Sequence, residues 1–320
     1  MTKKTTSSIS KHFRFERLTD GVYAAIHIDG GWGISNAGIV DLGDLTLVFD
    51  TGLTPEAGRD LRALALALTG KESDYVLMSH YHNDHIRGSQ VFAESVAVST
   101  ARTRELIVTL GQDELEADRK NAPERVETMK AFARSDDLKK VSQATFFLPY
   151  WHGILATLQE TRLRLPELTF RNRLTFHGSQ RSAVLIETSL GHTESDCMLL
   201  LPQDGIVFCG DLLFVRGHPY LGDGNPESLL SILGKLKNLK ARTYVPGHGP
   251  VGNKEDLDKM TLYIRTLIEQ AHKVLARGGT EEDAVMEPVP EPFADWILAQ
   301  PFYESNLRFL YGRLARSSVK

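Results

Sequence analysis

Cysteine is scarce in this chain, and long apolar segments are absent. The only two cysteines in 320 residues are Cys197 and Cys209, too few for a disulfide framework, and we expect both to be buried, reduced thiols. No segment approaches the roughly 18 consecutive apolar residues of a membrane helix, and the first residues lack the apolar stretch of a secretory signal. These absences predict a cytoplasmic protein without a membrane partner.

An excess of charge of either sign is also missing. The formal net charge is -4 and the isoelectric point is near 6.3, which gives no electrostatic reason to expect nucleic acid as a partner. The hydrophobic fraction of 42% and the charged fraction of 24% are ordinary for a globular protein. Composition therefore favours a globular protein acting on a small molecule, and it does not indicate the oligomeric state.

Short apolar runs separated by turn residues fill the first hundred residues. One helix is predicted between them, because Thr54 can cap its first turn, Pro55 suits the first position and Gly70 ends the apolar pattern. The apolar runs predict strands over residues 21–28, 34–41, 45–50, 75–78 and 96–99.

Residues 101–165 differ in character from the segments around them. Charged stretches alternate there with helical patterning, and the aromatic cluster Phe146, Phe147, Tyr150 and Trp151 follows. We interpret this segment as a helical insertion, either an ordinary packed subdomain or a lid over a cleft. Residues 254–320 are predicted to form a helical extension, with helices over 254–277, 280–286 and 302–315.

A faint internal repeat organises the chain as one domain over residues 1–320. Further strands are expected at 174–176, 183–189, 197–201 and 205–209, and each half then reads strand, acid, helix, strand, histidine. The acids in this pattern are Asp50 and Asp211, and the histidines are His80 and His248. Two such units packed face to face give an α/β fold, a four-layer αββα sandwich with acids and histidines at the shared seam.

The strongest chemical signal is the run His80-x-His82-x-Asp84-His85. Residues two apart at a strand end project to one side, so His80 and His82 can bind one ion. Asp84 and His85 lie further along and can reach a neighbouring ion. Imidazole and carboxylate suit zinc, and iron or manganese nearly as well.

Three further segments each place a metal-capable residue beside glycine after an apolar strand. They are Gly191-His192, Gly210-Asp211 and Gly247-His248. A sharp turn at glycine exposes a side chain at a sheet edge. Five of the eleven histidines of the chain occur in these settings and in the first motif.

This arrangement resembles the metallo-β-lactamase superfamily over residues 20–250. The resemblance implies that the first metal is bound by His80, His82 and His192 and the second by Asp84, His85 and His248. It also implies that Asp211 bridges the two ions, which we expect to be zinc. Where some true lactamases have cysteine at the second site, this chain has aspartate or histidine, so it is more similar to glyoxalase II and the lactonases.

The expected function is metal-dependent hydrolysis, in which a metal-bound hydroxide attacks an ester, thioester, lactone or lactam-type bond. Asp84 is predicted to orient the nucleophile and to transfer protons. His218 and Tyr220 follow Asp211 on a loop and are predicted substrate contacts. The main alternative is a mononuclear iron oxygenase of the same fold, similar to persulfide dioxygenases. A nuclease of the superfamily and a non-enzymatic metal-binding protein remain as further alternatives.

Overall fold

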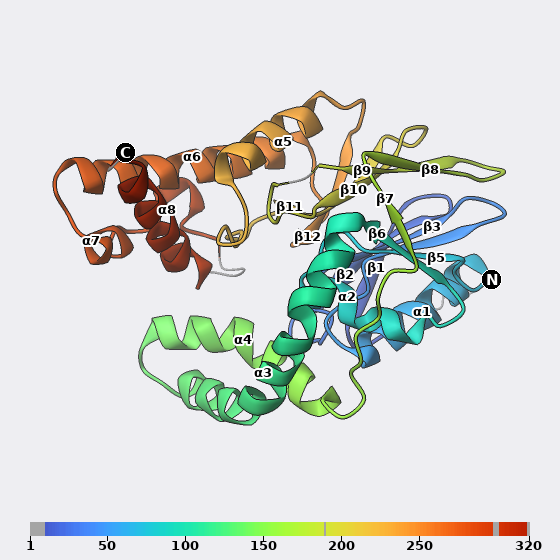
Figure 1. Cartoon of the computed structure of the whole chain (residues 1–320), viewed down its shortest axis with the longest axis horizontal. Helices are drawn as coiled ribbons and strands as arrows, with labels where there is room; N and C mark the ends of the chain where they lie inside the picture. The colour runs from blue at the N-terminus through green and yellow to red at the C-terminus, as the bar shows by residue number, and fades with distance from the viewer. Residues whose placement is uncertain (1–9, 189, 297–300, 319–320) are drawn as a thin grey trace.

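The computed structural model describes residues 10–188, 190–296 and 301–318. Its two β-sheets lie face to face with helices on their outer surfaces (Figure 1). The fold is therefore the expected αββα sandwich. Among the described residues, no helix is both long and apolar enough to cross a membrane.

The first sheet contains seven strands in the order in which they occur along the chain. Its first four strands are antiparallel and the remaining ones are parallel to β4. The strands are β1 (Phe13–Thr19), β2 (Val22–His27), β3 (Ala37–Asp41), β4 (Thr46–Phe49), β5 (Tyr75–Leu77), β6 (Val96–Thr100) and β7 (Leu168–Phe170).

The second sheet contains five strands in the order β12-β11-β10-β9-β8. Only β11 and β12 are parallel, with α5 connecting them. The strands are β8 (Arg173–His177), β9 (Ser182–Glu187), β10 (Cys197–Leu201), β11 (Ile206–Phe214) and β12 (Thr243–His248). The expected strand 183–189 ends earlier than predicted, and its residue 189 lies outside the described residues.

The helices follow the predicted pattern closely. Helix α1 is capped by Thr54 and ends at Gly70, which has a φ of 73°. The α-helices are α1 (Pro55–Thr69), α2 (Asn83–Ile86), α3 (Ala101–Ala133), α4 (Leu138–Thr157), α5 (Pro226–Asn238), α6 (Lys254–Ala276), α7 (Glu281–Val285) and α8 (Phe302–Ser318), and the short 3-10 helices are Arg87–Val91 and Glu291–Phe293.

Three apolar clusters hold the layers together. Side chains between the sheets include Phe49 and Phe208, whose ring centroids are 6.0 Å apart. Leu61 of α1 packs on the outer face of the first sheet. A larger cluster joins the second sheet to α5, α6 and α8, with Tyr263 fully buried in it. Both cysteines are free and buried, as expected.

Some strand bounds differ from the sequence-based prediction for local reasons. The strand expected from residue 34 begins only at Ala37, because Ile34 has a positive φ of 64° that strand geometry excludes. Strand β11 continues to Phe214, so Asp211 lies inside the strand and not after it. The pairing of β11 with β12 shifts register on both sides of Gly210, whose φ is 51°. Strands β1 and β7 were not predicted.

Asn36 joins the two sheets at the end of the sandwich where the segments of His85 and His248 meet. Its amide nitrogen donates to the carbonyl oxygens of Pro246 and Gly249 at 2.9 and 2.8 Å, and its amide oxygen accepts from the backbone of His27. The side chain is 3% exposed. These bonds fix the loop before β3 against the end of β12.

We predict that Asn36→Ala lowers the free energy of unfolding by about 2–4 kcal/mol, because it leaves buried backbone groups without partners. Urea denaturation of the purified variant measures this change. Asn238→Ala, at an exposed position in α5, is the matched control and should change stability by less than about 0.5 kcal/mol. Equal stability of both variants would contradict the role given to Asn36.

Candidate metal centre

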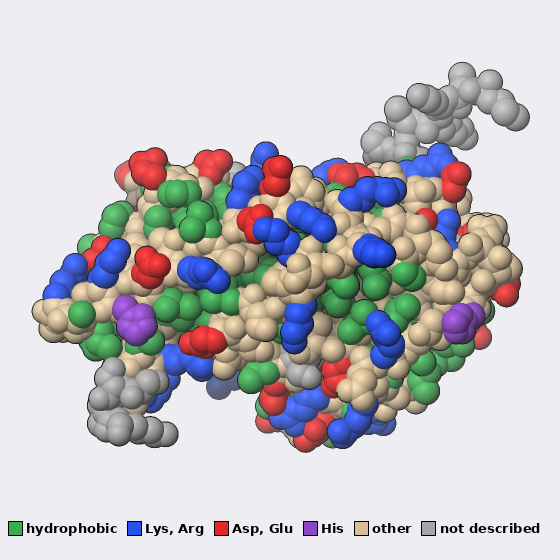
Figure 2. Space-filling model, turned by 90° about the horizontal axis from the view of Figure 1, so that it is seen from above, with side chains coloured by type: hydrophobic (Ala, Val, Ile, Leu, Met, Phe, Trp, Pro, Cys, Tyr) green, Lys and Arg blue, Asp and Glu red, His purple; other side chains and the backbone are tan. Residues whose placement is uncertain are grey.

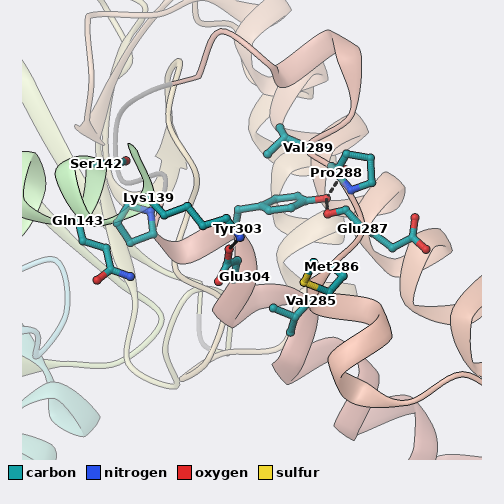
Figure 3. Close-up of a pocket in the computed structure, with 11 residues that line it drawn as sticks. Lys139, Ser142, Gln143, Val285, Met286, Glu287, Pro288, Val289, Tyr303 and Glu304 are labelled. Carbon is teal, nitrogen blue, oxygen red and sulfur yellow. Dashed lines mark hydrogen bonds and ion pairs between the residues drawn. The ribbon is translucent and has the colours of Figure 1, made fainter. Parts of the chain in front are cut away.

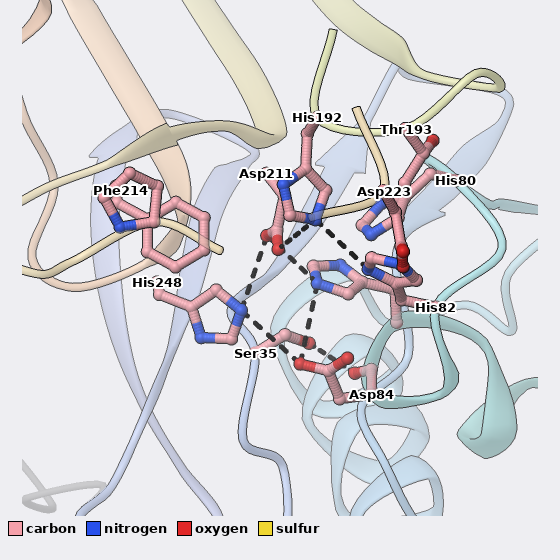
Figure 4. Close-up of polar contacts among 12 residues, drawn as sticks. Ser35, His80, His82, Asp84, His192, Thr193, Asp211, Phe214, Asp223 and His248 are labelled. Carbon is pink, nitrogen blue, oxygen red and sulfur yellow. Dashed lines mark hydrogen bonds and ion pairs between the residues drawn. The ribbon is translucent and has the colours of Figure 1, made fainter. Parts of the chain in front are cut away.

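All seven side chains predicted to bind metal lie together at one end of the sandwich (Figure 4). They form two groups in which the candidate ligand atoms lie within 4.8 Å of one another. One group contains His80, His82, His192 and Asp211, and the other contains Asp84, His85 and His248. Because they come from both sheets, the site depends on the packing of one half of the chain against the other.

Asp211 lies between the two groups. Its Oδ2 is 3.2 Å from Nε2 of His192, and its Oδ1 is 3.1 Å from Nε2 of His85 and 3.4 Å from Nε2 of His248. One carboxylate oxygen therefore faces each group. This is the arrangement that a bridging carboxylate requires.

Gly247 makes room for this carboxylate. A Cβ atom at residue 247 would lie 1.8 Å from Oδ1 of Asp211, so any other residue would displace the acid. The glycine that precedes His248 is thus explained by the close approach of Asp211 to the backbone of β12.

In the first group, His80 and His192 are buried, and burial outweighs the nearby carboxylate of Asp211. Burial, followed by the neighbouring His85 and His82, holds the pKa of His80 well below its usual value. Burial lowers the pKa of His192 to about 4. Both imidazoles are therefore neutral at physiological pH, which is the form that binds a metal ion.

The second group has the opposite electrostatic balance. Burial disfavours the charged form of His85, but the carboxylates of Asp211, Asp84 and Asp50 outweigh it and raise its pKa well above the usual value. Burial also opposes the charge of Asp211, yet His248, His85 and His192 hold its pKa well below the usual range. The carboxylates thus favour a positive charge at this group, carried by the imidazoles or by a bound cation.

Unpartnered buried atoms indicate that a metal ion fits this site. Nε2 of His80 is buried and has no hydrogen-bond partner among the described residues. Nε2 of His85 and Oδ1 of Asp211 are also buried and form no hydrogen bond there, although they lie only 3.1 Å apart. A buried polar atom without a partner is costly unless a bound group satisfies it. Imidazole nitrogens and carboxylate oxygens of this kind are the usual ligands of zinc and related divalent ions.

Asp50 orients two residues of the site, although it was not predicted as a site residue. Its Oδ2 lies 2.8 Å from Nδ1 of His85, and the backbone and hydroxyl of Ser79 donate to its two oxygens at 2.8 Å. The bond to Nδ1 leaves Nε2 of His85 facing Asp211. The internal repeat had placed Asp50 opposite Asp211 and was the signal that could have identified it.

Two further acids support the histidines and were missed. Oδ2 of Asp223 lies 3.0 Å from Nε2 of His82, so Nδ1 of His82 faces the cluster, 3.1 Å from Nε2 of His192. Buried Asp196 accepts hydrogen bonds from the backbone of Gly191 and Thr193 and fixes the loop of His192. Asp223 lies in an irregular loop between two glycines, and nothing in that pattern marked it.

The two predicted substrate contacts have different outcomes. The ring of Tyr220 lies 6.5 Å from that of His192, at the edge of the centre. His218 is 0% exposed, with Nδ1 2.9 Å from the hydroxyl of Tyr263 and Nε2 3.0 Å from the carbonyl oxygen of Trp296. The prediction for His218 was wrong, because both its nitrogens are used in packing the C-terminal segment.

Comparison with known proteins places the chain in a family. A sequence model of the metallo-beta-lactamase superfamily matches residues 30–248, which is more than half of the chain. The chain therefore belongs to the metallo-beta-lactamase superfamily, a family of hydrolases.

Two curated proteins are similar to this chain at low sequence identity. The chain is 32% identical to a hydroxyacylglutathione hydrolase of Synechococcus sp. over 100 residues, which cover 30% of this chain and 38% of that protein. It is 22% identical to the beta-lactamase-like protein 2 homolog of Caenorhabditis elegans over 95% of this chain and 87% of that protein.

Solved structures confirm the fold. A metallo-beta-lactamase from Pontibacter korlensis superposes with a TM-score of 0.58 at 17% identity, covering 79% of this chain and 99% of that one. A sec-alkylsulfatase from Pseudomonas sp. gives 0.69 at 15% identity, covering 94% of this chain and 50% of that one.

We predict that Asp50→Asn weakens metal binding by about 10- to 100-fold, because His85 loses the group that fixes its orientation. Competition with a chelator of known affinity measures the change. Asp258→Asn, at an exposed position in α6, serves as the control. An unchanged metal affinity in the Asp50 variant would contradict the role of Asp50 in orienting His85.

We predict that His218→Ala lowers the free energy of unfolding by about 2–4 kcal/mol, since it removes two buried hydrogen bonds and leaves a void. The metal content should stay at the level of the unsubstituted protein. Thermal unfolding and elemental analysis of the same sample test both parts. Loss of metal with unchanged stability would contradict this structural role.

Proposed function

We propose that the protein is a hydrolase with two zinc ions that cleaves an ester, thioester, lactone or lactam-type bond of a small molecule. The observation that carries this proposal is the position of Asp211, with one oxygen facing each group of candidate ligands. The first ion would be held by His80, His82 and His192, the second by Asp84, His85 and His248, and both by Asp211.

When bound, a pair of divalent ions supplies an activated water and polarises the oxygen of the scissile bond. Asp211 is 5% exposed, so its part is to balance charge inside the site. Asp84 is more open, with a side chain that is 15% exposed and an Oδ2 3.4 Å from Nε2 of His248. Asp84 is therefore the acid that can take a proton from water and return it to a leaving group.

The position of Asp84 is fixed by the loop that precedes β3. The hydroxyl of Ser35 donates to the backbone carbonyl oxygen of Asp84 at 2.5 Å, and Asn36 beside it bonds to the segment of His248. The printed name of the cyanobacterial relative, a hydroxyacylglutathione hydrolase, supports an acyl bond as the target. Tyr220, at the edge of the centre, remains the proposed substrate contact.

We expect about two zinc ions per chain in protein purified without added metal. Elemental analysis of the purified protein measures the identity and number of the ions. About one iron per chain would overturn the proposal and favour the mononuclear oxygenase, for which oxygen uptake with persulfide substrates is the assay.

Alanine in place of His80, His192 or Asp211 should abolish hydrolysis of esters, thioesters and lactones and reduce the metal content to about one ion or fewer per chain. Asp84→Asn should lower kcat by about 100-fold or more while His80, His82 and His192 keep their ion. The readouts are steady-state kinetics and elemental analysis. If the His80 variant kept both its metal and its rate, the ligand assignment would be wrong.

A further inference from the structure

Four partly exposed aromatic side chains from three segments follow one another beside the metal centre. We call them the aromatic rim: Tyr150 and Phe147 of α4, Phe302 at the start of α8, and Tyr220 in the loop after β11. Ring centroids are 6.4 Å apart from Tyr150 to Phe147, 6.0 Å from Phe147 to Phe302 and 5.4 Å from Phe302 to Tyr220. Both the insertion and the C-terminal extension therefore contribute to one continuous row.

Each end of the aromatic rim lies close to the candidate metal ligands. At one end, the side-chain amide of Asn83 donates to the hydroxyl of Tyr150 at 2.7 Å, and Asn83 stands between His82 and Asp84 in the chain. At the other end, the ring of Tyr220 lies 6.5 Å from that of His192. The row thus starts beside one candidate ligand and ends beside another.

The insertion is held in place and does not hang free over the centre. Arg87, which follows α2, forms a buried ion pair with Asp118 of α3 at 2.6 Å, and Arg59 of α1 pairs with Glu160 at 3.0 Å. Trp151 and Ile154 of α4 belong to an apolar cluster with residues of the core. The aromatic rim is therefore a fixed wall, and a ligand would meet it without a closing movement of the insertion.

An outer cavity continues the same face of α4 away from the centre. It has a volume of about 280 Å³ and lies between α4 and the segment of α7 and α8 (Figure 3). Ser142 and Gln143 of α4 line it, and Phe146 follows them on the same helical face. Apolar lining on the opposite side comes from Met286, Val289 and Tyr303.

The lining of the outer cavity also includes the polar and charged side chains of Lys139, Glu287 and Glu304. Lys139 of α4 pairs with Glu304 of α8 at 2.6 Å across the outer cavity, so these two charges neutralise each other. The face of the molecule seen from above the view of Figure 1 carries interspersed apolar and charged side chains (Figure 2). The apolar surface beside the metal centre is therefore the row of rings of the aromatic rim, which fits an uncharged, apolar group.

We propose that the aromatic rim binds the apolar acyl chain of the substrate, so that the hydrolysed compound is an ester, thioester or lactone with a medium to long unbranched acyl chain. This inference rests on the proposed function, which places the scissile bond at the metal centre. A chain attached to that bond would pass along the faces of Tyr150 and Phe147 towards Phe302. Each methylene buried there raises affinity about fourfold.

Binding of straight-chain carboxylates tests the proposal without turnover. Titration calorimetry of the metal-containing protein with butanoate, hexanoate, octanoate and decanoate should show affinity rising about two- to fourfold per methylene. In Phe147→Ala and Phe302→Ala the increase should fall below about twofold per methylene. Affinity independent of chain length in the unsubstituted protein would overturn the proposal.

Matched variants separate the aromatic rim from general damage to the insertion. Phe132→Ala removes an aromatic residue of α3 that lies over the side chain of Lys140 and outside the rim, and it should leave the chain-length dependence intact. Phe147→Leu keeps an apolar side chain and should retain most of it. Circular dichroism and metal content identify a misfolded variant, in which case the other alanine variant and the chain-length series of the unsubstituted protein decide the test.

Hydrolysis of two series of esters tests whether the aromatic rim binds the acyl part or the alcohol part of the ester. Esters of ethanol with acids of increasing length should show kcat/KM rising with chain length, whereas acetate esters of longer alcohols should not. A dependence on the alcohol chain alone would overturn the acyl assignment. If short esters are hydrolysed but carboxylate affinity does not depend on acyl length, the proposed role of the aromatic rim is refuted and the proposed hydrolase function stands. If carboxylate affinity rises with acyl length but no ester is hydrolysed, the acyl-binding role of the aromatic rim is supported and the proposed hydrolase function is refuted.

Discussion

The buried carboxylate of Asp211 is the contact on which both the site and its surroundings depend. It lies inside β11 at a break in the register with β12, and it meets His192 on one side and His85 and His248 on the other. A charge with so little access to water is stable only when opposite charges or donors surround it. Gly247 leaves room for the carboxylate, and the packing of the two sheets brings Nε2 of His85 to within 3.1 Å of it.

The acids around the centre divide the work between holding and reacting. Asp50 is 1% exposed and is fully engaged by Ser79 and His85, and Asp223 holds His82 from the outer side. The side chain of Asp84 is 15% exposed, against 5% for Asp211. In the proposed function, Asp84 is therefore the candidate ligand carboxylate that exchanges a proton with the substrate.

The segments outside the sandwich give the centre its individual character. The superfamily match ends at residue 248, yet Phe302 of the C-terminal extension contacts both Phe147 of the insertion and Tyr220 beside His192. Two excursions that are far apart in the sequence thus meet over one site. In the proposed function, the sandwich provides the chemistry, and the added helices provide a wall that distinguishes one substrate from another.

The sequence by itself determined the sandwich and the set of residues at its end. The alternation of apolar runs and turns predicted most of the strands, because it is a local property of the sequence. The close spacing of His80, His82, Asp84 and His85 marked four of the seven candidate metal ligands for the same reason. Tertiary structure alone decided which side chains face the centre. His218 was predicted to contact substrate and is instead buried against Tyr263 and Trp296. Asp223 carries no local signal. The meeting of Phe147, Phe302 and Tyr220 could not be predicted either, because these residues come from segments brought together only by folding.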